Sequence, residues 1–165
     1  MRQKLYYLAG VSGLAFFALP FIHPFGPVKQ PHSPELLAGV QWDDSAVLPM
    51  FERACQDCHS ERTRWPVYSY LPLVSWAVEK DVAAGRRHMD LSRWDQYSMD
   101  QKRDLLARIG VEVRNHQMPL PRYLLLHPEA RLSEAEIQAI YEWTKAQRRA
   151  LRNNQQVPGN KPDRG

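Results

Sequence analysis

The sequence predicts an all-α fold, a bundle of about four helices. Residues 98–101 (Ser-Met-Asp-Gln) and 133–136 (Ser-Glu-Ala-Glu) both match the capping box, in which a serine and a later glutamine or glutamate bind the first amides of a helix. Apolar residues behind these signals recur at helical spacing. No segment alternates apolar and polar residues over the length of a strand. These observations favour helices and argue against a sheet.

Four helices are expected in chain order. The first covers residues 49–59 and starts with Pro49, which suits a first helical turn. The second covers residues 72–88, the third begins at Ser98 and the fourth at Ser133. The apolar or mostly apolar faces expected on them are Leu48, Phe51 and Ala54, then Leu73, Trp76, Ala77 and Val82, then Leu105, Leu106, Ile109 and Val113, and finally Ile137, Ile140, Tyr141 and Thr144.

The chain is expected to have four parts. Residues 1–22 have a basic start and an apolar continuation, the pattern of a signal peptide or a membrane anchor. An uncleaved single-pass anchor is expected, because no A-x-A cleavage site follows and the stretch can span a bilayer. Residues 23–43 are rich in proline and are expected to form a spacer. Residues 44–152 form the predicted domain, and residues 153–165 a disordered basic tail.

The formal net charge of +4 arises at the two ends of the chain. Basic residues precede the apolar stretch and others follow Gln147, whereas the body between them is slightly acidic. A basic face on the body would indicate nucleic acid as a partner, and the sequence contains none. The expected macromolecular contact is with a membrane, through residues 1–22.

Both cysteines of the chain lie in one motif, Cys55-Gln56-Asp57-Cys58-His59, which has the C-x-x-C-H pattern of covalent haem attachment. On a helical turn, residues at i, i+3 and i+4 share one face. Two thioether bonds could then form along one porphyrin edge while the imidazole reaches the iron. The motif predicts one covalent haem c per chain, with Cys55 and Cys58 as the attachment sites and His59 as the proximal iron ligand.

A cysteine pair can also belong to a zinc site or to a thiol–disulfide protein. A zinc site commonly needs four protein ligands, and the chain has neither a second cysteine pair nor a close histidine pair. A thioredoxin-like pair is expected in a βαβ context, which the helical pattern does not provide. A haem-free thiol–disulfide protein that uses Cys55 and Cys58 stays open as an alternative.

Residues on both sides of this motif resemble those of one family. They are Cys58-His59-Ser60, Trp65-Pro66, Tyr68-Ser69, Pro72, Val74-Ser75-Trp76, Gly85-Arg86, Trp94, Met118-Pro119, His127-Pro128-Glu129-Ala130 and Leu132-Ser133. Over residues 48–145 the chain resembles a bacterial haem-binding domain family of small, exported, cytochrome-c-like proteins. The resemblance implies a cytochrome-c-like fold, one covalent haem and a methionine as the distal ligand.

Met118 is the expected distal iron ligand. Pro119 disfavours helical backbone at the residue before it, which suits a thioether held on a loop. His116, two residues earlier, is the main rival. Weaker candidates, which are better explained as core, surface or loop residues, are His88, Met89, Met99 and His127.

These features predict a monohaem c-type cytochrome that transfers single electrons at the periplasmic side of the bacterial cytoplasmic membrane. The chain is not expected to be an enzyme, because no acid–base pair for catalysis stands out in the sequence. The alternative is a haem sensor or a peroxidase-like module with a labile sixth ligand. The sequence names no redox partner.

Overall fold

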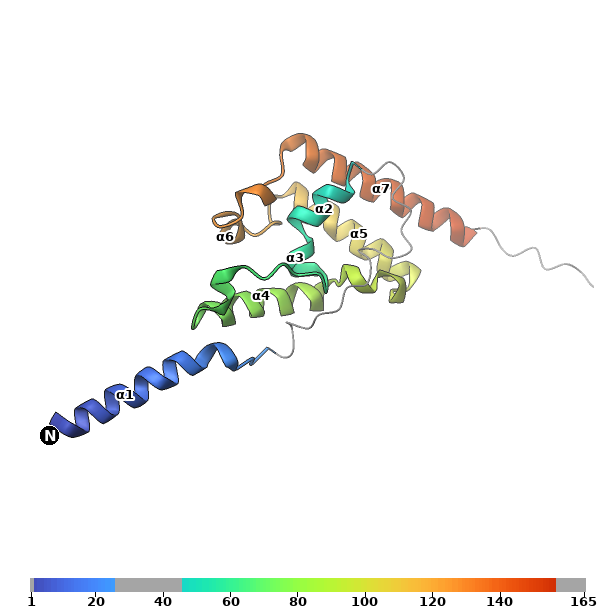
Figure 1. Ribbon diagram of the computed structural model, residues 1–165. Helices are drawn as coiled ribbons and strands as arrows, with labels where there is room; N and C mark the ends of the chain where they lie inside the picture. Colours follow the sequence, from blue (N-terminus) through green and yellow to red (C-terminus); the bar gives the residue numbers. More distant parts are fainter. Residues whose placement is uncertain (1, 26–45, 157–165) are drawn as a thin grey trace, which may run out of the picture. The chain divides into compact units, whose positions relative to one another are not determined.

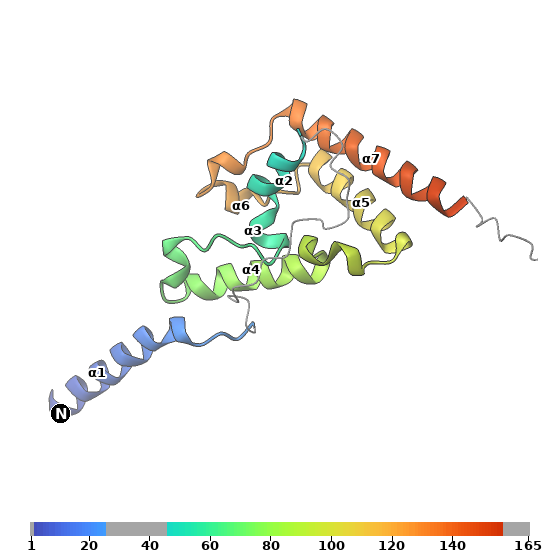
Figure 2. The same ribbon diagram turned by 45° about the vertical axis from the view of Figure 1, so that its right-hand side comes forward.

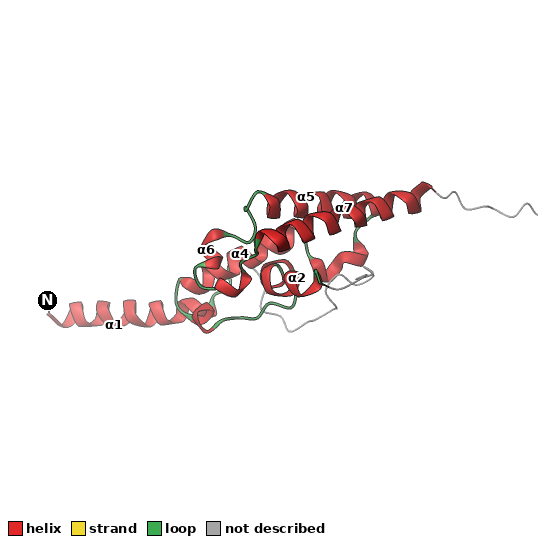
Figure 3. Ribbon diagram, turned by 90° about the horizontal axis from the view of Figure 1, so that it is seen from above, coloured by secondary structure: helices red, strands yellow, loops and turns green. Residues whose placement is uncertain are grey.

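The computed structural model describes residues 2–25 and 46–156, which form helices joined by loops (Figure 1). No strand occurs in these two stretches (Figure 3), and the predicted all-α class is confirmed. By their internal contacts the described residues fall into two compact units. The first unit holds residues 2–25 and 56–92, and the second holds the other described residues.

The first unit is built around one long helix. Its elements are α1 (Arg2–Ala18), the 3-10 helix η1 (Leu19–Phe21), α3 (Gln56–His59), the 3-10 helix η2 (Val67–Tyr70) and α4 (Val74–His88). Both α3 and η2 pack against α4. Val82 and Ala83 form a small buried core, and Trp65 and Val78 pack against it. A further 3-10 helix, η3 (Leu91–Gln96), follows α4 in the chain.

α1 displays large apolar side chains on its surface. Tyr6, Leu8 and Leu14 are each about two-thirds exposed or more. Within the described stretches, no helix combines the length and the apolar character needed to cross a membrane. Most of the predicted spacer, residues 23–43, lies outside the described residues.

The second unit is organised by two long helices. Its elements are α2 (Leu48–Ala54), α5 (Met99–Arg114), the short α6 (Pro121–Leu124), the 3-10 helix η4 (Pro128–Ala130) and α7 (Glu134–Gln156). α5 and α7 lie side by side in both Figure 1 and Figure 2. The apolar residues that they bury are Leu106, Ile109, Val113, Ile137 and Ile140. Phe51 of α2 is fully buried and meets Trp143 edge to face, with ring centroids 5.3 Å apart.

Both predicted capping boxes are present. The Gln101 N–H donates to Ser98 Oγ at 3.2 Å, and the Ser98 N–H donates to Gln101 Oε1 at 2.8 Å. At the start of α7, the Ser133 N–H donates to Glu136 Oε2 at 2.8 Å, and the Glu136 N–H donates to Ser133 Oγ at 3.3 Å. These reciprocal bonds satisfy amides that have no partner inside the helix. The predicted starts of the third and fourth helices are therefore confirmed.

The segment predicted as one helix over residues 49–59 forms two helices. α2 ends at Ala54, and α3 begins at Gln56. Between them Cys55 has φ −122°, far from the helical value of about −63°. Cys55 therefore does not share a continuous helix with the other motif residues, and the prediction of one face on one helix is wrong in this respect.

The face that α4 buries also differs from the prediction. Leu73 has a left-handed backbone (φ 64°), so α4 begins only at Val74, and the Leu73 side chain is 56% exposed. Ala77 is exposed as well. The residues that α4 does bury are Ser75, Glu79, Val82, Ala83 and Gly85. Two of these five, Ser75 and Glu79, are polar. A prediction from apolar residues therefore selected a different face of α4 from the one that is buried.

α7 extends beyond the predicted end of the domain at residue 152. It continues to Gln156, so residues 153–156 are helical and are not part of the predicted disordered basic tail. The remainder of the predicted tail, residues 157–165, lies outside the described residues.

Candidate functional site

The C-x-x-C-H motif lies where α2 is followed by α3 in the chain. Cys55 is the C-terminal cap of α2, and its N–H donates to the Phe51 carbonyl oxygen at 3.0 Å. Cys58 and His59 both lie on the single turn of α3, so the structure brings these two residues together in the first unit. Cys55, Cys58 and His59 are half-buried, and no disulfide joins the two cysteines.

The imidazole of His59 is held by the main chain after α4. Its Nδ1 lies 3.1 Å from the carbonyl oxygen of Met89. Because a carbonyl oxygen can only accept a hydrogen bond, Nδ1 carries the proton and Nε2 keeps its lone pair. Burial lowers the pKa of His59 below its usual 6.5, and this effect outweighs the opposing one of the Met89 hydrogen bond. The ring is therefore neutral at pH 7, in the form that ligates a metal through Nε2.

Met89 is positioned by the end of α4. Its N–H donates to the Gly85 carbonyl oxygen at 2.9 Å, and its extended backbone (φ −163°, ψ 124°) ends the helix. Its side chain is buried. Close by, Ser92 Oγ accepts a hydrogen bond from the Glu61 N–H at 3.0 Å, which ties the segment after α4 to the segment after α3. The sequence offered Met89 as a sulfur ligand, whereas the structure gives its carbonyl oxygen a role at His59.

The two residues between the cysteines hold the loop that follows the motif. Gln56 Nε2 donates to the Arg62 carbonyl oxygen at 3.1 Å. The Asp57 carboxylate accepts from the Arg64 main-chain N–H at 3.0 Å and from its guanidinium Nε and Nη2, each at 3.1 Å. Gln56 and Asp57 are buried. A bidentate pair on a buried carboxylate is geometrically well defined, so residues 61–64 are held close to α3.

Arg86 of α4 connects that helix to the end of the motif. Its Nε donates to the Ser60 carbonyl oxygen at 2.8 Å, and its Nη2 donates to Thr63 Oγ1 at 3.0 Å. The Thr63 hydroxyl in turn donates to the Asp57 carbonyl oxygen at 2.7 Å. One guanidinium group therefore holds the main chain directly after His59. Motif spacing does not reveal this role, although Gly85-Arg86 is among the residues that resemble the family.

Met118 belongs to the second unit, in the loop after α5. α5 ends in a Schellman motif, because the His116 N–H donates to the Val113 carbonyl oxygen at 3.1 Å and the Gln117 N–H to that of Glu112 at 2.9 Å. His116 supplies the left-handed residue that this motif needs, with φ 55°. The Met118 N–H also donates to the Glu112 carbonyl oxygen, at 3.2 Å, and its side chain is half-buried.

The rival histidines of the second unit have structural contacts of their own. The His116 side chain is exposed, and its Nε2 lies 3.8 Å from a carboxylate oxygen of Glu134. The His127 ring stacks on Tyr123 with centroids 4.2 Å apart, and its Nδ1 bonds Glu129 Oε1 at 3.0 Å. Of the other sequence candidates in the described stretches, His88 is exposed, Met99 is half-buried and Met89 is buried.

These residues fit a haem group. Cys58 and His59 share one turn, and a neutral imidazole whose Nδ1–H is already bonded offers Nε2 to the iron. Two cysteines and one histidine in this order form the donor set of covalent haem attachment.

The chain is similar to a known family and to one characterised protein. A family model described as "Haem-binding domain" matches residues 15–146. Cytochrome c peroxidase Ccp of Escherichia coli (strain K12) is 25% identical over 145 residues, which cover 82% of this chain and 31% of that protein. No solved structure matches significantly. Since the family model covers well over half of the chain, this protein belongs to the haem-binding domain family.

Proposed function

We propose that this protein is a monohaem c-type cytochrome that transfers single electrons. In this proposal Cys55 and Cys58 hold one haem through thioether bonds, and His59 is the proximal ligand. The observation that carries the proposal is the hydrogen bond between His59 Nδ1 and the Met89 carbonyl oxygen. It leaves Nε2 for the iron, and family membership already establishes haem binding.

The residues around His59 restrict its movement. The Nδ1–H bond to Met89 orients the ring and increases the basicity of Nε2. The bonds of Arg86 to Ser60 and Thr63 hold α3 against α4, so the imidazole stays in place. When bound, haem supplies one-electron chemistry at its iron, at a potential that ligands and surroundings tune over about 0.8 V. A rigidly held ligand suits this chemistry, because the iron's surroundings then rearrange little when the iron gains or loses an electron.

We propose Met118 as the distal ligand. It is half-buried, and Pro119 follows it on the loop after α5. His116 forms the left-handed end of α5. The His127 ring stacks on Tyr123 and bonds Glu129. A neutral thioether as the sixth ligand raises the reduction potential relative to a second histidine.

We further propose that the haem-bearing part works in the periplasm, held at the cytoplasmic membrane by the N-terminal segment. Thioether attachment takes place outside the cytoplasm in bacteria, so a covalent haem requires export. The exposed apolar side chains of α1, such as Tyr6, Leu8 and Leu14, support a role of this segment in contact with lipid. Cell fractionation followed by haem staining of the separated proteins tests this location. Haem-loaded protein in the cytoplasmic fraction would contradict the proposal.

Covalent attachment is tested by mass and extraction. The full chain, made in a host with a cytochrome maturation system, should gain the mass of one haem and keep its colour in acid–acetone. Replacing both Cys55 and Cys58 by alanine should abolish the covalent haem, whereas His88→Ala, which changes an exposed histidine, should not. Recovery of an unmodified wild-type chain from a competent host would refute covalent binding but not family membership.

A second function, peroxide reduction, is favoured by the similarity to a cytochrome c peroxidase. It requires a sixth position that small ligands can enter. Stopped-flow mixing of the ferric protein with cyanide and with hydrogen peroxide separates the two functions. A low-spin haem that resists both reagents supports the electron carrier. Rapid ligand binding, with peroxide turnover sustained by an electron donor, supports the peroxidase.

A further inference from the structure

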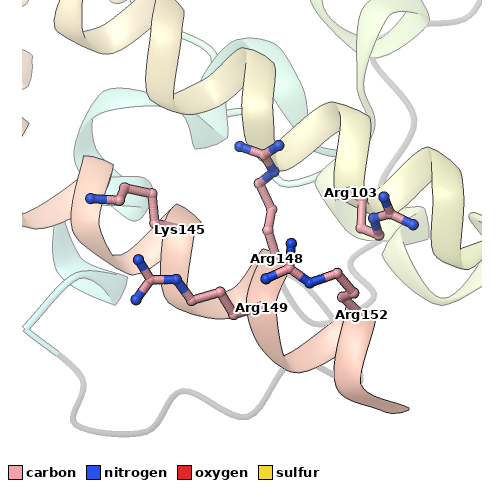
Figure 4. A pocket seen from close by; sticks show the side chains of 5 residues that line it. All are labelled: Arg103, Lys145, Arg148, Arg149 and Arg152. Atoms are coloured by element: carbon pink, nitrogen blue, oxygen red, sulfur yellow. The ribbon is translucent and has the colours of Figure 1, made fainter. Parts of the chain in front are cut away.

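A row of cations follows one side of α7. Lys145, Arg148, Arg149 and Arg152 stand at positions i, i+3, i+4 and i+7, which share one face of a helix. Arg103 of α5 completes the set, and the five side chains line a hollow of about 170 Å³ (Figure 4). All five belong to the second unit.

Most of this charge is not neutralised locally. Asp100 pairs with Arg103 at 3.1 Å, and Glu142 pairs with Lys145 at 3.0 Å. In the part of the chain that the structure describes, no ion pair reaches the other three arginines, and all three are exposed. The hollow therefore carries a surplus of three positive charges.

The sequence of α7 adds to the repulsion. No residue three or four positions away from Arg148, Arg149 or Arg152 is acidic. Several are basic instead, as in the pairs Lys145 with Arg149 and Arg148 with Arg152. Like charges at this spacing destabilise a helix. A solvated surface helix would be more stable with acidic residues at these positions, so the row needs another explanation.

Stabilisation of the helix end does not account for the row. Cations favour the last turn of a helix, where the unpaired carbonyl groups lie, and the effect falls off within that turn. The last turn of α7 contains no basic residue, and the row ends at Arg152, before Asn153.

We propose that this hollow binds a phosphate-bearing anion. Guanidinium groups donate paired hydrogen bonds that match the oxygens of phosphate, and four of the five cations are arginines. A volume of about 170 Å³ corresponds to about six water molecules, which is enough for a diphosphate group. The anion is either a soluble phosphate compound or the headgroup of an anionic phospholipid, since both present the same chemistry.

The soluble source is tested by calorimetric titration of pyrophosphate into the haem-loaded full chain at constant ionic strength. Wild type should bind saturably, and the double variant Arg148→Gln with Arg152→Gln should raise the Kd at least tenfold. A matched variant, Arg87→Gln with Arg108→Gln, removes the same charge from exposed positions that do not line the hollow. It should change the Kd by less than twofold.

The lipid source is tested by co-sedimentation with vesicles of phosphatidylglycerol and, separately, of phosphatidylcholine. The quantity compared is the vesicle-bound fraction of each variant relative to wild type. This ratio removes any contribution of α1 to lipid binding, because α1 is present in all the proteins. If Arg148→Gln with Arg152→Gln loses the phosphatidylglycerol preference and the matched variant keeps it, the ligand is a lipid headgroup. If the same double variant loses only pyrophosphate binding, the ligand is a soluble phosphate compound. Equal losses in both double variants, or no binding in either assay, would overturn the proposal. Circular dichroism and the haem spectrum confirm that each variant is folded.

Discussion

Gly85 of α4 lies directly against the main chain of Cys58. A Cβ atom at residue 85 would collide with the Cys58 carbonyl oxygen and would lie 2.9 Å from the carbonyl carbon. Only glycine permits this approach of one helix to the backbone of another. The packing of α3 on α4, and with it the position of His59 beside Met89, therefore depends on the absence of one side chain.

Gly85→Ala should displace α3 from α4. We expect the free energy of unfolding to fall by about 1–3 kcal/mol, as for other overpacked sites. The fraction of chains that carry haem should fall as well, because His59 and Cys58 move together. Urea denaturation and intact mass measure the two effects. Lys80→Ala, at an exposed position of the same helix, is the control, and equal stability of the two variants would contradict the prediction.

Met118→Ala should open the sixth position of the iron. We expect the loss of the weak methionine–iron charge-transfer band of the ferric protein and the appearance of a high-spin spectrum. Met118→His should restore a low-spin haem at a lower potential, because imidazole stabilises ferric iron better than a thioether does. His116→Gly should leave the spectrum unchanged. The reverse pattern, with His116→Gly opening the iron, would assign the distal position to His116.

His116→Gly should also stabilise the protein. His116 has φ 55° at the end of α5, a conformation that costs a residue with a Cβ more than it costs glycine. The free energy of unfolding should rise by about 0.5–1 kcal/mol, measured by thermal or urea denaturation. His88→Gly, which places glycine inside the last turn of α4, should lower it. If both variants lower the free energy of unfolding, the contacts of the His116 side chain contribute more to stability than the relief of its backbone conformation does.

Glu136 should make the second unit sensitive to acid. Hydrogen bonds from the Ser133 N–H, from Arg53 and from the Ser133 hydroxyl lower the pKa of Glu136 from 4.5 to about 2. The folded state therefore binds this proton less readily than the unfolded chain. The stabilisation is complete above pH 4.5 and is lost as the pH falls towards 2. Because solvent screens this carboxylate, Glu136→Gln should lower the free energy of unfolding at pH 7 by only about 1 kcal/mol.

The pH dependence provides the control for this prediction. In Glu136→Gln the fall in stability between pH 4.5 and 2 should be shallower than in wild type. Glu134→Gln removes an acid from the same first turn, yet this side chain is 83% exposed and should leave the slope nearly unchanged. Identical slopes in all three proteins would mean that the Ser133 and Arg53 contacts do not hold the charged carboxylate in solution.

The features that could be predicted from the sequence have local signals. Ser98 and Gln101 make both bonds of their capping box within one turn, so four letters of sequence suffice to place the start of α5. The C-x-x-C-H motif is equally local. Five consecutive residues suffice to identify Cys55, Cys58 and His59 as the candidate haem-binding residues.

The features that could not be predicted depend on main-chain geometry. The left-handed φ of Leu73 shifts the start of α4 and leaves this side chain exposed. The break at Cys55 separates α2 from α3 although the residues on either side of it, Ala54 and Gln56, are good helix formers. The role of the Met89 carbonyl oxygen has no sequence signal, because every residue carries a main-chain carbonyl oxygen. Its role appears only when the end of α4 is seen next to His59.

Three hydrogen bonds of the attachment turn lie within a stretch of nine residues, 56–64. Gln56 bonds Arg62, Asp57 bonds Arg64, and the Ser60 hydroxyl donates to the Gln56 carbonyl oxygen. Positions 57 and 64 should consequently change in concert among related chains, since an acid without its arginine would be buried alone. These bonds hold the loop to its own turn, whereas contacts with α4 and the residue after it hold the turn in place. A transplant of residues 55–64 into another helical protein should therefore need a glycine, an arginine and a free carbonyl oxygen at the places of Gly85, Arg86 and Met89.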